Sequence, residues 1–176
     1  MPTYYLLKSG RLEKRGVSAD YQRCDVGKRE EVEATIRGIE AKDGAIDVLV
    51  NNAGVNANFD ATEMTEEQWD RFFGIDLKAA WLGAKHVLPA MREAGRGAIV
   101  NVSSLHGFVT LEGFFPYAAA KSGLVGLTRS LALDYGEHGI RVNCVAPGFV
   151  RTRLVEESID RAADREAAER KMIAGV

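Results

Sequence analysis

The sequence has no apolar run near the ~18 residues that a membrane-spanning helix needs, and the run 4–7 is shorter than a signal-peptide core of ~7 to 15 residues. It has only two cysteines, Cys24 and Cys144, and no metal-ligand spacing. We therefore expect reduced, buried thiols, a cytoplasmic protein and no bound metal. Basic residues are not in excess either, with 23 Lys and Arg against 25 Asp and Glu, so nucleic acid is not an expected partner.

What the sequence does contain is an alternation of strand-like and helix-like segments, which is typical of a parallel sheet wrapped by helices. Its 176 residues fit one domain. Strands are expected at 19–26, 46–54, 97–104 and 139–148, and helices at 28–44, from about 66, from about 116 and at 153–173. Each strand ends in turn residues, so the loops that follow the strands gather at one edge of the predicted sheet. Open parallel sheets bind ligands at that edge.

The long helix after residue 65 has recognisable boundaries. Thr65 and Gln68 have the spacing of a capping box, whose reciprocal hydrogen bonds satisfy free amides at a helix start. Pro89 is expected in the final turns. The apolar residues of this helix cover more than one face, so we expect it to be buried against the sheet and against a neighbouring element.

The segment PYAAAKSG places Tyr117 and Lys121 four residues apart, so on a helix their side chains share one face. A cation close to a phenol lowers the phenol's pKa, which suits a group that passes a proton to and from a substrate oxygen. An isolated pair of this kind is more often a surface contact, because the pattern is short and common. Ser104 strengthens the acid-base interpretation, since it ends a predicted strand and its hydroxyl could hydrogen-bond the substrate oxygen.

Two further segments end strands at the same predicted edge. In NNAG, Ala53 and Gly54 allow a flat ligand to approach the backbone, and Asn51 can fasten neighbouring loops through its amide. The segment PGFVRT, 147–152, offers a rigid turn, backbone donors and a hydroxyl. Taken alone, each of these segments is an ordinary turn.

Together these segments resemble the short-chain dehydrogenase/reductase (SDR) family. The matching segments, in the family's order and spacing, are CDV at 24–26, NNAG at 51–54, NVSS at 101–104, YAAAK at 117–121 and RVNCVAPGFVRT at 141–152. The resemblance implies a Rossmann-like, doubly wound parallel sheet in a three-layer α/β/α arrangement. It also implies hydride transfer between an alcohol and a carbonyl, with NAD or NADP as the cofactor.

The resemblance further implies roles for individual residues. Tyr117 would be the general acid-base, Lys121 its partner and a ribose contact, and Ser104 the anchor of the substrate oxygen. The adenosine and ribose end of the cofactor would meet Asp25, Val26, Asn51, Ala53 and Gly54. The nicotinamide would be lined by Pro147, Gly148, Val150 and Thr152.

Asp76, the fourth catalytic candidate, departs from the family pattern. The family has an asparagine twenty-eight residues before the serine, where it helps to hold a water that relays protons through the lysine. An ionised carboxylate at this position would favour the charged form of Lys121 and disfavour the anionic form of Tyr117. We therefore expect a proton relay that survives with an altered pH profile.

A larger departure is the missing Gly-rich phosphate loop, because KSGRLEKRG near the N-terminus is no G-x-G-x-x-G. The deficit is roughly one βαβ unit of ~30 residues, and the C-terminal strand of the family is missing as well. Strand order 3-2-1-4 then leaves a gap between the strands at 19–26 and 46–54. Three explanations stay open: a fragment, which we favour, a truncated relative that no longer catalyses, and a rearranged N-terminal element.

The leading hypothesis is thus an NAD(P)-dependent oxidoreductase acting on a small-molecule alcohol or carbonyl, and its rival is a non-catalytic relative that serves as a binding or oligomerisation partner. A hydrolase is disfavoured because Ser104 and His106 lack an orienting acid and a G-x-S-x-G elbow. His106 is expected near the substrate mouth, and His86 and His138 at solvated helix positions. Small residues in the helix from 117 allow close packing, against the chain's own sheet or against a second copy, and the resemblance implies a homodimer or homotetramer.

Overall fold

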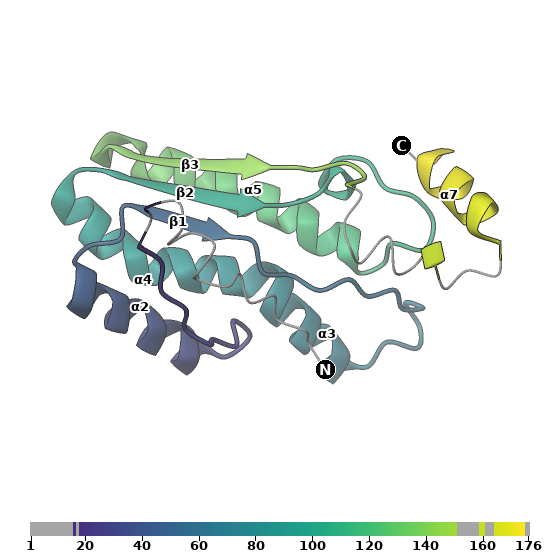
Figure 1. The fold of residues 1–176 in the computed structure, drawn as a ribbon, viewed down its shortest axis with the longest axis horizontal. Helices are drawn as coiled ribbons and strands as arrows, with labels where there is room; N and C mark the ends of the chain where they lie inside the picture. Colours follow the sequence, from purple (N-terminus) through teal and green to yellow (C-terminus); the bar gives the residue numbers. More distant parts are fainter. Residues whose placement is uncertain (1–15, 17, 151–158, 161–163, 175–176) are drawn as a thin grey trace.

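The centre of the fold is a three-stranded parallel sheet. A computed structural model of the chain describes residues 16, 18–150, 159–160 and 164–174. The sheet consists, in spatial order, of β1 (Val48–Asn51), β2 (Gly97–Val102) and β3 (Ile140–Val145). All three strands point the same way, so their carboxyl ends share one edge (Figure 1). The predicted α/β class with a parallel sheet is confirmed.

Helices alternate with these strands, as the pattern predicts. The helical elements are, in chain order, α2 (Arg29–Asp43), α3 (Glu66–Phe73), the π-helical turn η1 (Gly74–Lys78), α4 (Ala79–Ala94), the 3-10 turn η2 (Leu105–Gly107), α5 (Tyr117–Tyr135), the 3-10 turn η3 (Gly136–His138) and α7 (Arg165–Ala174). The capping box is confirmed, because Gln68 N donates to Thr65 Oγ1 at 3.2 Å and Thr65 N donates to Gln68 Oε1 at 2.9 Å. None of the described helices is long and apolar enough to cross a bilayer.

The helices α2, α4 and α5 build the core on one face of the sheet. Ile99 of β2 is fully buried there together with Val87 of α4, and Leu49 of β1 packs against the same cluster. On the opposite face, Val48 and Val50 are each 56% exposed. The described residues therefore supply the sheet and one helical layer, and the second layer of the expected three-layer arrangement is not among them.

Residues 19–26 do not form the predicted strand. Cys24 and Val26 pack against the core, but the segment makes no strand ladder, and its backbone turns into α2 through the bond from Lys28 N to Asp25 O at 2.9 Å. The sequence pattern is strand-like, but a strand also needs a neighbour with free backbone groups. The interior strands that would supply one are not among the described residues.

The ends of the helices follow their sequence signals. Pro89 lies inside α4, and Pro116 directly precedes α5. Gly139 connects η3 to β3 with φ +72°, and an added Cβ would overlap the carbonyl oxygen of Gly95, so this turn requires glycine. Of the helix expected at 153–173, α7 and residues 159–160 are described, and the rest lies outside the described residues.

Candidate active site at the carboxyl edge of the sheet

Tyr117 and Lys121 stand on the first turns of α5, at the carboxyl edge of the sheet. The expected one-turn relation is confirmed, with Lys121 Nζ 5.4 Å from the centroid of the Tyr117 ring. Lys121 is only 6% exposed, whereas Tyr117 is half-buried. Lys121 Nζ also donates to Val102 O at 3.4 Å, which links the ammonium to the end of β2. The pair is therefore a buried cation beside a partly accessible phenol, unlike a surface contact.

The turn η1 brings Asp76 to the same place. A π-helical turn widens the helix locally, and such turns occur often at functional sites. Asp76 is buried, with Oδ2 3.3 Å from Lys121 Nζ and Oδ1 accepting a hydrogen bond from Val55 N at 2.7 Å. Asp76 and Lys121 belong to different helical elements, so helical spacing alone could not pair them. The ion pair is thus a product of the tertiary fold.

Burial raises the pKa of Asp76 above its ordinary value, against the lowering effects of the Val55 amide and of Lys121. Asp76 Oδ2 makes no hydrogen bond with any described residue, although it lies in ion-pair range of Lys121. The contact therefore brings two opposite charges together without the aligned hydrogen bond that would compensate their burial fully.

The backbone of NNAG passes directly over this ion pair. A Cβ added to Gly54 would lie 3.2 Å from Asp76 Oδ2 and 3.4 Å from Lys121 Nζ. These separations are tight for a side chain in a packed site, so glycine lets the strand end approach both charges. The predicted close approach of the backbone at Gly54 is thus directed at the protein's own ion pair.

Ser104 follows β2 by two residues and is 8% exposed. Its Oγ accepts a hydrogen bond from His106 N at 3.2 Å, which caps the turn η2. The His106 ring stacks on Phe114, with centroids 3.7 Å apart, and lies edge-on to the Tyr117 ring at 6.0 Å. Ser104 and Tyr117 therefore both contact His106, one through its backbone and the other through its ring.

The turn after β3 lies against the same loop. The carbonyl of Pro147 accepts from Leu105 N at 2.9 Å. A Cβ added to Gly148 would meet no heavy atom within 4 Å, and Val150 is 54% exposed. Thr152, expected at the nicotinamide, lies outside the described residues. This turn is thus fixed at Pro147 and open to solvent beyond it.

Asn51 was expected at the cofactor, but its amide is engaged inside the fold. Asn51 Nδ2 donates to Asn101 Oδ1 at 2.8 Å, and Asn101 Nδ2 donates to Thr128 Oγ1 at 2.9 Å. The Thr128 hydroxyl in turn donates to Leu124 O at 2.7 Å. This buried chain ties β1, β2 and α5 together below the site. Sequence reasoning missed Asn101 and Thr128, although a polar residue inside an apolar strand and one inside an apolar helix were the available signal.

Asp25 and Val26 lie beside η1. The Asp25 carboxylate accepts from Gly27 N at 3.0 Å, and its own amide donates to Glu31 Oε2 at 2.7 Å. A Cβ added to Gly27 would lie 3.3 Å from Ile75, the neighbour of Asp76. The structure thus brings Tyr117, Lys121, Asp76 and Gly54 into one cluster, with Ser104 joined to Tyr117 through His106. Asp25 and Val26 directly precede Gly27, which lies beside Ile75 of η1.

The remaining histidines and cysteines lie outside this cluster. His86 is half-buried, and its Nε2 is buried without a hydrogen bond to any described residue, so the expectation of a solvated position is wrong for His86. Cys24 and Cys144 are free and partly buried. No group of three metal-ligating side chains occurs in the part of the chain that the structure describes.

Comparison with known proteins decides the family. A family model described as short chain dehydrogenase matches residues 8–163. The chain belongs to the short-chain dehydrogenase/reductase family. Human dehydrogenase/reductase SDR family member 4 is 42% identical over 142 residues, which cover 80% of this chain and 51% of that protein. Levodione reductase from Leifsonia aquatica is 41% identical over 150 residues, covering 83% of this chain and 56% of that protein.

Solved SDR structures share the fold. A putative short-chain dehydrogenase/reductase from Burkholderia xenovorans gives a TM-score of 0.86 at 35% identity, over 93% of this chain and 63% of that one. A gluconate 5-dehydrogenase from Burkholderia cenocepacia, in complex with NADP and tartrate, gives a TM-score of 0.79 at 31% identity, over 88% and 60%. The Rossmann-like fold expected from the motifs is confirmed. The chain spans between 51% and 63% of the lengths of these four relatives.

Proposed function

We propose that this chain carries the acid-base site of an NAD(P)-dependent oxidoreductase that interconverts an alcohol and a carbonyl in a small molecule. The observation that supports the proposal is the placement of Tyr117 one turn before the buried Lys121, on the helix that contacts η2, whose N-cap is Ser104. Membership of an oxidoreductase family supports it as well. The substrate oxygen would lie between the Tyr117 phenol and the Ser104 hydroxyl.

In this proposal each side chain has one task. Tyr117 gives a proton to the substrate oxygen during reduction and takes it back during oxidation. Ser104 donates a hydrogen bond to the same oxygen, which stabilises the negative charge that develops there. Lys121 favours the anionic phenol by its positive charge, while Asp76, at 3.3 Å from Lys121 Nζ, offsets part of that charge. A bound nicotinamide would supply or accept the hydride.

The described residues fit one end of such a cofactor. We propose that the nicotinamide and its ribose lie beside Lys121, between Gly54 and the turn at Pro147 and Gly148. Gly54 approaches Lys121 closely, and an added Cβ at Gly148 would meet no heavy atom within 4 Å, which supports this placement. A Gly-rich loop leading into a helix, which would hold the pyrophosphate, is not among residues 18–150. The proposal therefore assigns the nicotinamide end to this site. The gluconate dehydrogenase relative binds NADP, so NADP is the cofactor to try first.

Exchange of the Tyr117 hydroxyl tests the proposal. Tyr117→Phe should lower the turnover of alcohol or ketone panels, followed by the near-ultraviolet absorbance of reduced nicotinamide, by about 100-fold or more, because the proton donor is lost. Tyr135→Phe, at the far end of the same helix, is the matched control and should keep turnover and thermal midpoint near the native values. Native turnover that survives in Tyr117→Phe would contradict the acid-base assignment.

A second candidate is a non-catalytic SDR relative that acts as a binding or oligomerisation partner. The described residues 18–150 contain no Gly-rich loop that leads into a helix, which favours this alternative, because such a loop would contribute to binding of the cofactor's pyrophosphate. It predicts a folded chain whose thermal midpoint does not move with NAD or NADP. A cofactor-dependent increase of the midpoint in the native chain would exclude it.

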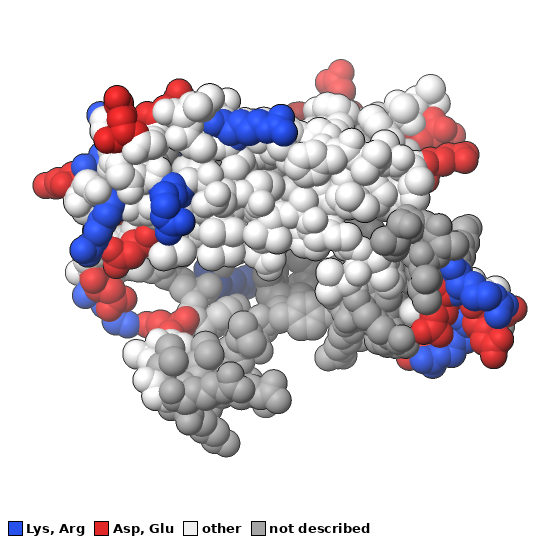
Figure 2. Space-filling model, turned by 90° about the horizontal axis from the view of Figure 1, so that it is seen from above, with Lys and Arg blue, Asp and Glu red and all other residues white. Residues whose placement is uncertain are grey.

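We also propose a homo-oligomer, dimer or tetramer, in which helices α4 and α5 form the contact. Leu133 of α5 is 83% exposed, and a groove of about 350 Å³ between the two helices is lined by Trp81 and Tyr135. Leu133 and Trp81 are exposed apolar side chains, and exposed apolar surface often marks a protein contact. Figure 2, which looks down on the β3 edge, shows most Lys, Arg, Asp and Glu side chains toward the two ends of the molecule. Light scattering with Leu133→Glu, expected to dissociate the assembly, tests this contact.

A further inference from the structure

Ser103, the residue before Ser104, makes a contact that the proposed chemistry does not use. It is 4% exposed, and its Oγ donates a hydrogen bond to the backbone carbonyl of Lys121 at 2.9 Å. That carbonyl belongs to the residue whose ammonium lies in the buried ion pair with Asp76. The end of β2 is therefore bonded directly to the turn of α5 that carries the acid-base pair.

Gly107 meets the same contact from the other side. A Cβ added there would lie 2.8 Å from Ser103 Oγ and 2.9 Å from the Lys121 carbonyl oxygen. Gly107 does not have a positive φ, so its backbone conformation is open to any residue. The need for glycine arises from proximity alone. The Lys121 oxygen is part of a helix backbone and cannot rotate away, so a methyl group would displace either η2 or α5.

Further hydrogen bonds hold η2 in place. Ser122 Oγ donates to the carbonyl of Gly107 at 3.1 Å, and Ser103 N donates to the carbonyl of Val145 at 2.8 Å. We call Ser103, Gly107 and Ser122, with the Lys121 carbonyl, the η2 clamp. It fastens the end of β2 to α5 by side chains and to β3 by backbone. Figure 1 shows these three elements meeting at the arrowhead end of β2 and β3.

From this geometry we infer that Ser103 and Gly107 are positioning residues that set the separation between the Ser104 hydroxyl and the Tyr117 phenol. Ser104 is the next residue after Ser103, and Tyr117 lies one rigid helical turn before Lys121. The η2 clamp joins these two halves directly beside the site, so its spacing sets theirs. The expected effect on turnover rests on the proposed function, whereas the effect on geometry does not.

Two variants with matched controls test the inference. Ser103→Ala removes the hydrogen bond, and Gly107→Ala adds the colliding methyl group. Both should lower kcat by ~10- to 100-fold with KM little changed, because a displacement of about 1 Å costs that much in a positioned reaction. The controls are Ser130→Ala, on the exposed side of α5, and Gly126→Ala, where an added Cβ meets nothing within 4 Å. These controls should keep the native kcat.

The combination of the two variants sharpens the result. In Ser103→Ala with Gly107→Ala the added methyl loses one of its two close neighbours, so the loss should be smaller than the product of the single losses. A kcat of Ser103→Ala equal to that of Ser130→Ala would overturn the inference. An effect of Ser103→Ala that appears only in KM or only in the thermal midpoint would also overturn the inference, because it would show that the hydrogen bond stabilises the fold without positioning the reacting groups. If Gly107→Ala does not fold, Ser103→Ala alone decides.

A crystal structure of Ser103→Ala decides the geometric part without any turnover. The distance between Ser104 Oγ and Tyr117 Oη should differ from that in the native protein by about 0.5 Å or more, which is the tolerance of a positioned site. An unchanged distance would overturn the inference. Should the native chain show no turnover with any substrate, the proposed function fails, and this structural comparison still tests the η2 clamp.

Discussion

The two faces of the sheet differ in how far this chain covers them. Ile99 of β2 is fully buried on the face that carries α4 and α5. Val50 of the neighbouring strand β1 points to the other face and is 56% exposed. Parallel sheets are usually covered on both faces. Lys121 and Asp76, two residues of the proposed site, come from helices of the covered face. The hydrophobic core and the proposed site therefore share one side of the sheet, whereas side chains on the other side of β1 are largely exposed.

The largest effect is expected when one side chain on each face of the sheet is truncated. Ile99→Ala should lower the free energy of unfolding by ~2 to 5 kcal/mol, because it removes a fully buried side chain and leaves a cavity. Val50→Ala, on the open face of the neighbouring strand, should change it by less than about 0.5 kcal/mol. Urea unfolding monitored by circular dichroism measures both. Equal losses of unfolding free energy would mean that the two faces of the sheet are covered to the same extent.

A smaller effect is expected where the covered face holds polar groups. Asn101→Ala should cost ~1 to 3 kcal/mol, because it leaves the Asn51 amide and the Thr128 hydroxyl without their buried partner. The matched control is Asn143→Ala, an exposed asparagine on the opposite face of β3, which should be nearly neutral. The same unfolding measurement applies. An unchanged unfolding free energy in Asn101→Ala would show that water replaces the lost hydrogen-bond partner.

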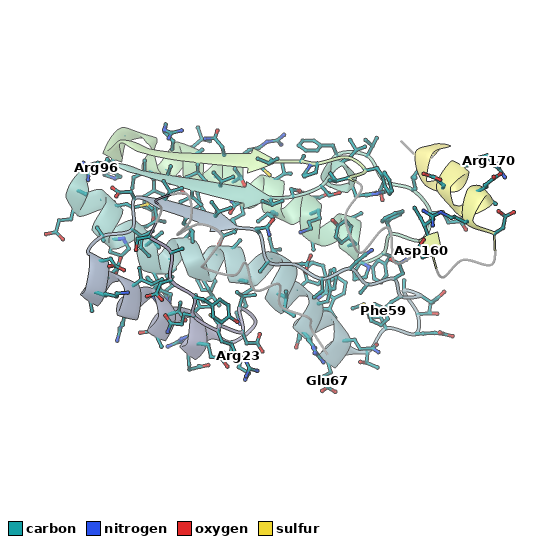
Figure 3. The ribbon with its side chains drawn as sticks, viewed as in Figure 1. Arg23, Phe59, Glu67, Arg96, Asp160 and Arg170 are labelled. Atoms are coloured by element: carbon teal, nitrogen blue, oxygen red, sulfur yellow. The ribbon has the colours of Figure 1, made fainter. Side chains whose placement is uncertain are left out.

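Much of this fold could be predicted from the sequence, because its signals are local. The segments 46–54, 97–104 and 139–148 contain β1, β2 and β3, since each is an apolar run that ends in turn residues. The start of α3 follows from its capping box, and the shared face of Tyr117 and Lys121 follows from helical spacing. Figure 3 shows Arg96, which directly precedes β2, at one end of the molecule and Phe59 toward the other end.

What the sequence did not predict depends on distant partners. The strand expected at 19–26 does not form, because strand formation depends on a neighbour and not on composition alone. Neither the spacing of apolar residues nor a capping motif marks the π-helical turn at Asp76, yet this turn aims the carboxylate at Lys121. The contact of Ser103 with the Lys121 carbonyl spans two elements. The roles of the site residues toward substrate and cofactor stay predictions.

The smallest expected effect is a pH dependence of the unfolding free energy. It concerns Asp76, the one buried carboxylate among the described residues of the covered face. Burial raises the pKa of Asp76 above 3.8, so its stabilising contribution is fully present below that pH, where the group is protonated in both the folded and unfolded states. The contribution is lost as the pH rises through the raised pKa, because the folded state then has to hold a buried anion. The amide of Asp76→Asn does not ionise, so this variant keeps its stability as the pH rises.

The unfolding free energy of Asp76→Asn relative to the native chain should therefore increase steadily as the pH is raised from acid to neutral. Asp70→Asn, at an exposed position of α3 in the same helical run, is the control, and its difference from the native chain should stay nearly constant over that range. Urea titrations at a series of pH values measure both. A relative stability of Asp76→Asn that falls with rising pH would mean that the attraction of Lys121 outweighs the cost of burial, and the covered face would then hold a stabilising ion pair.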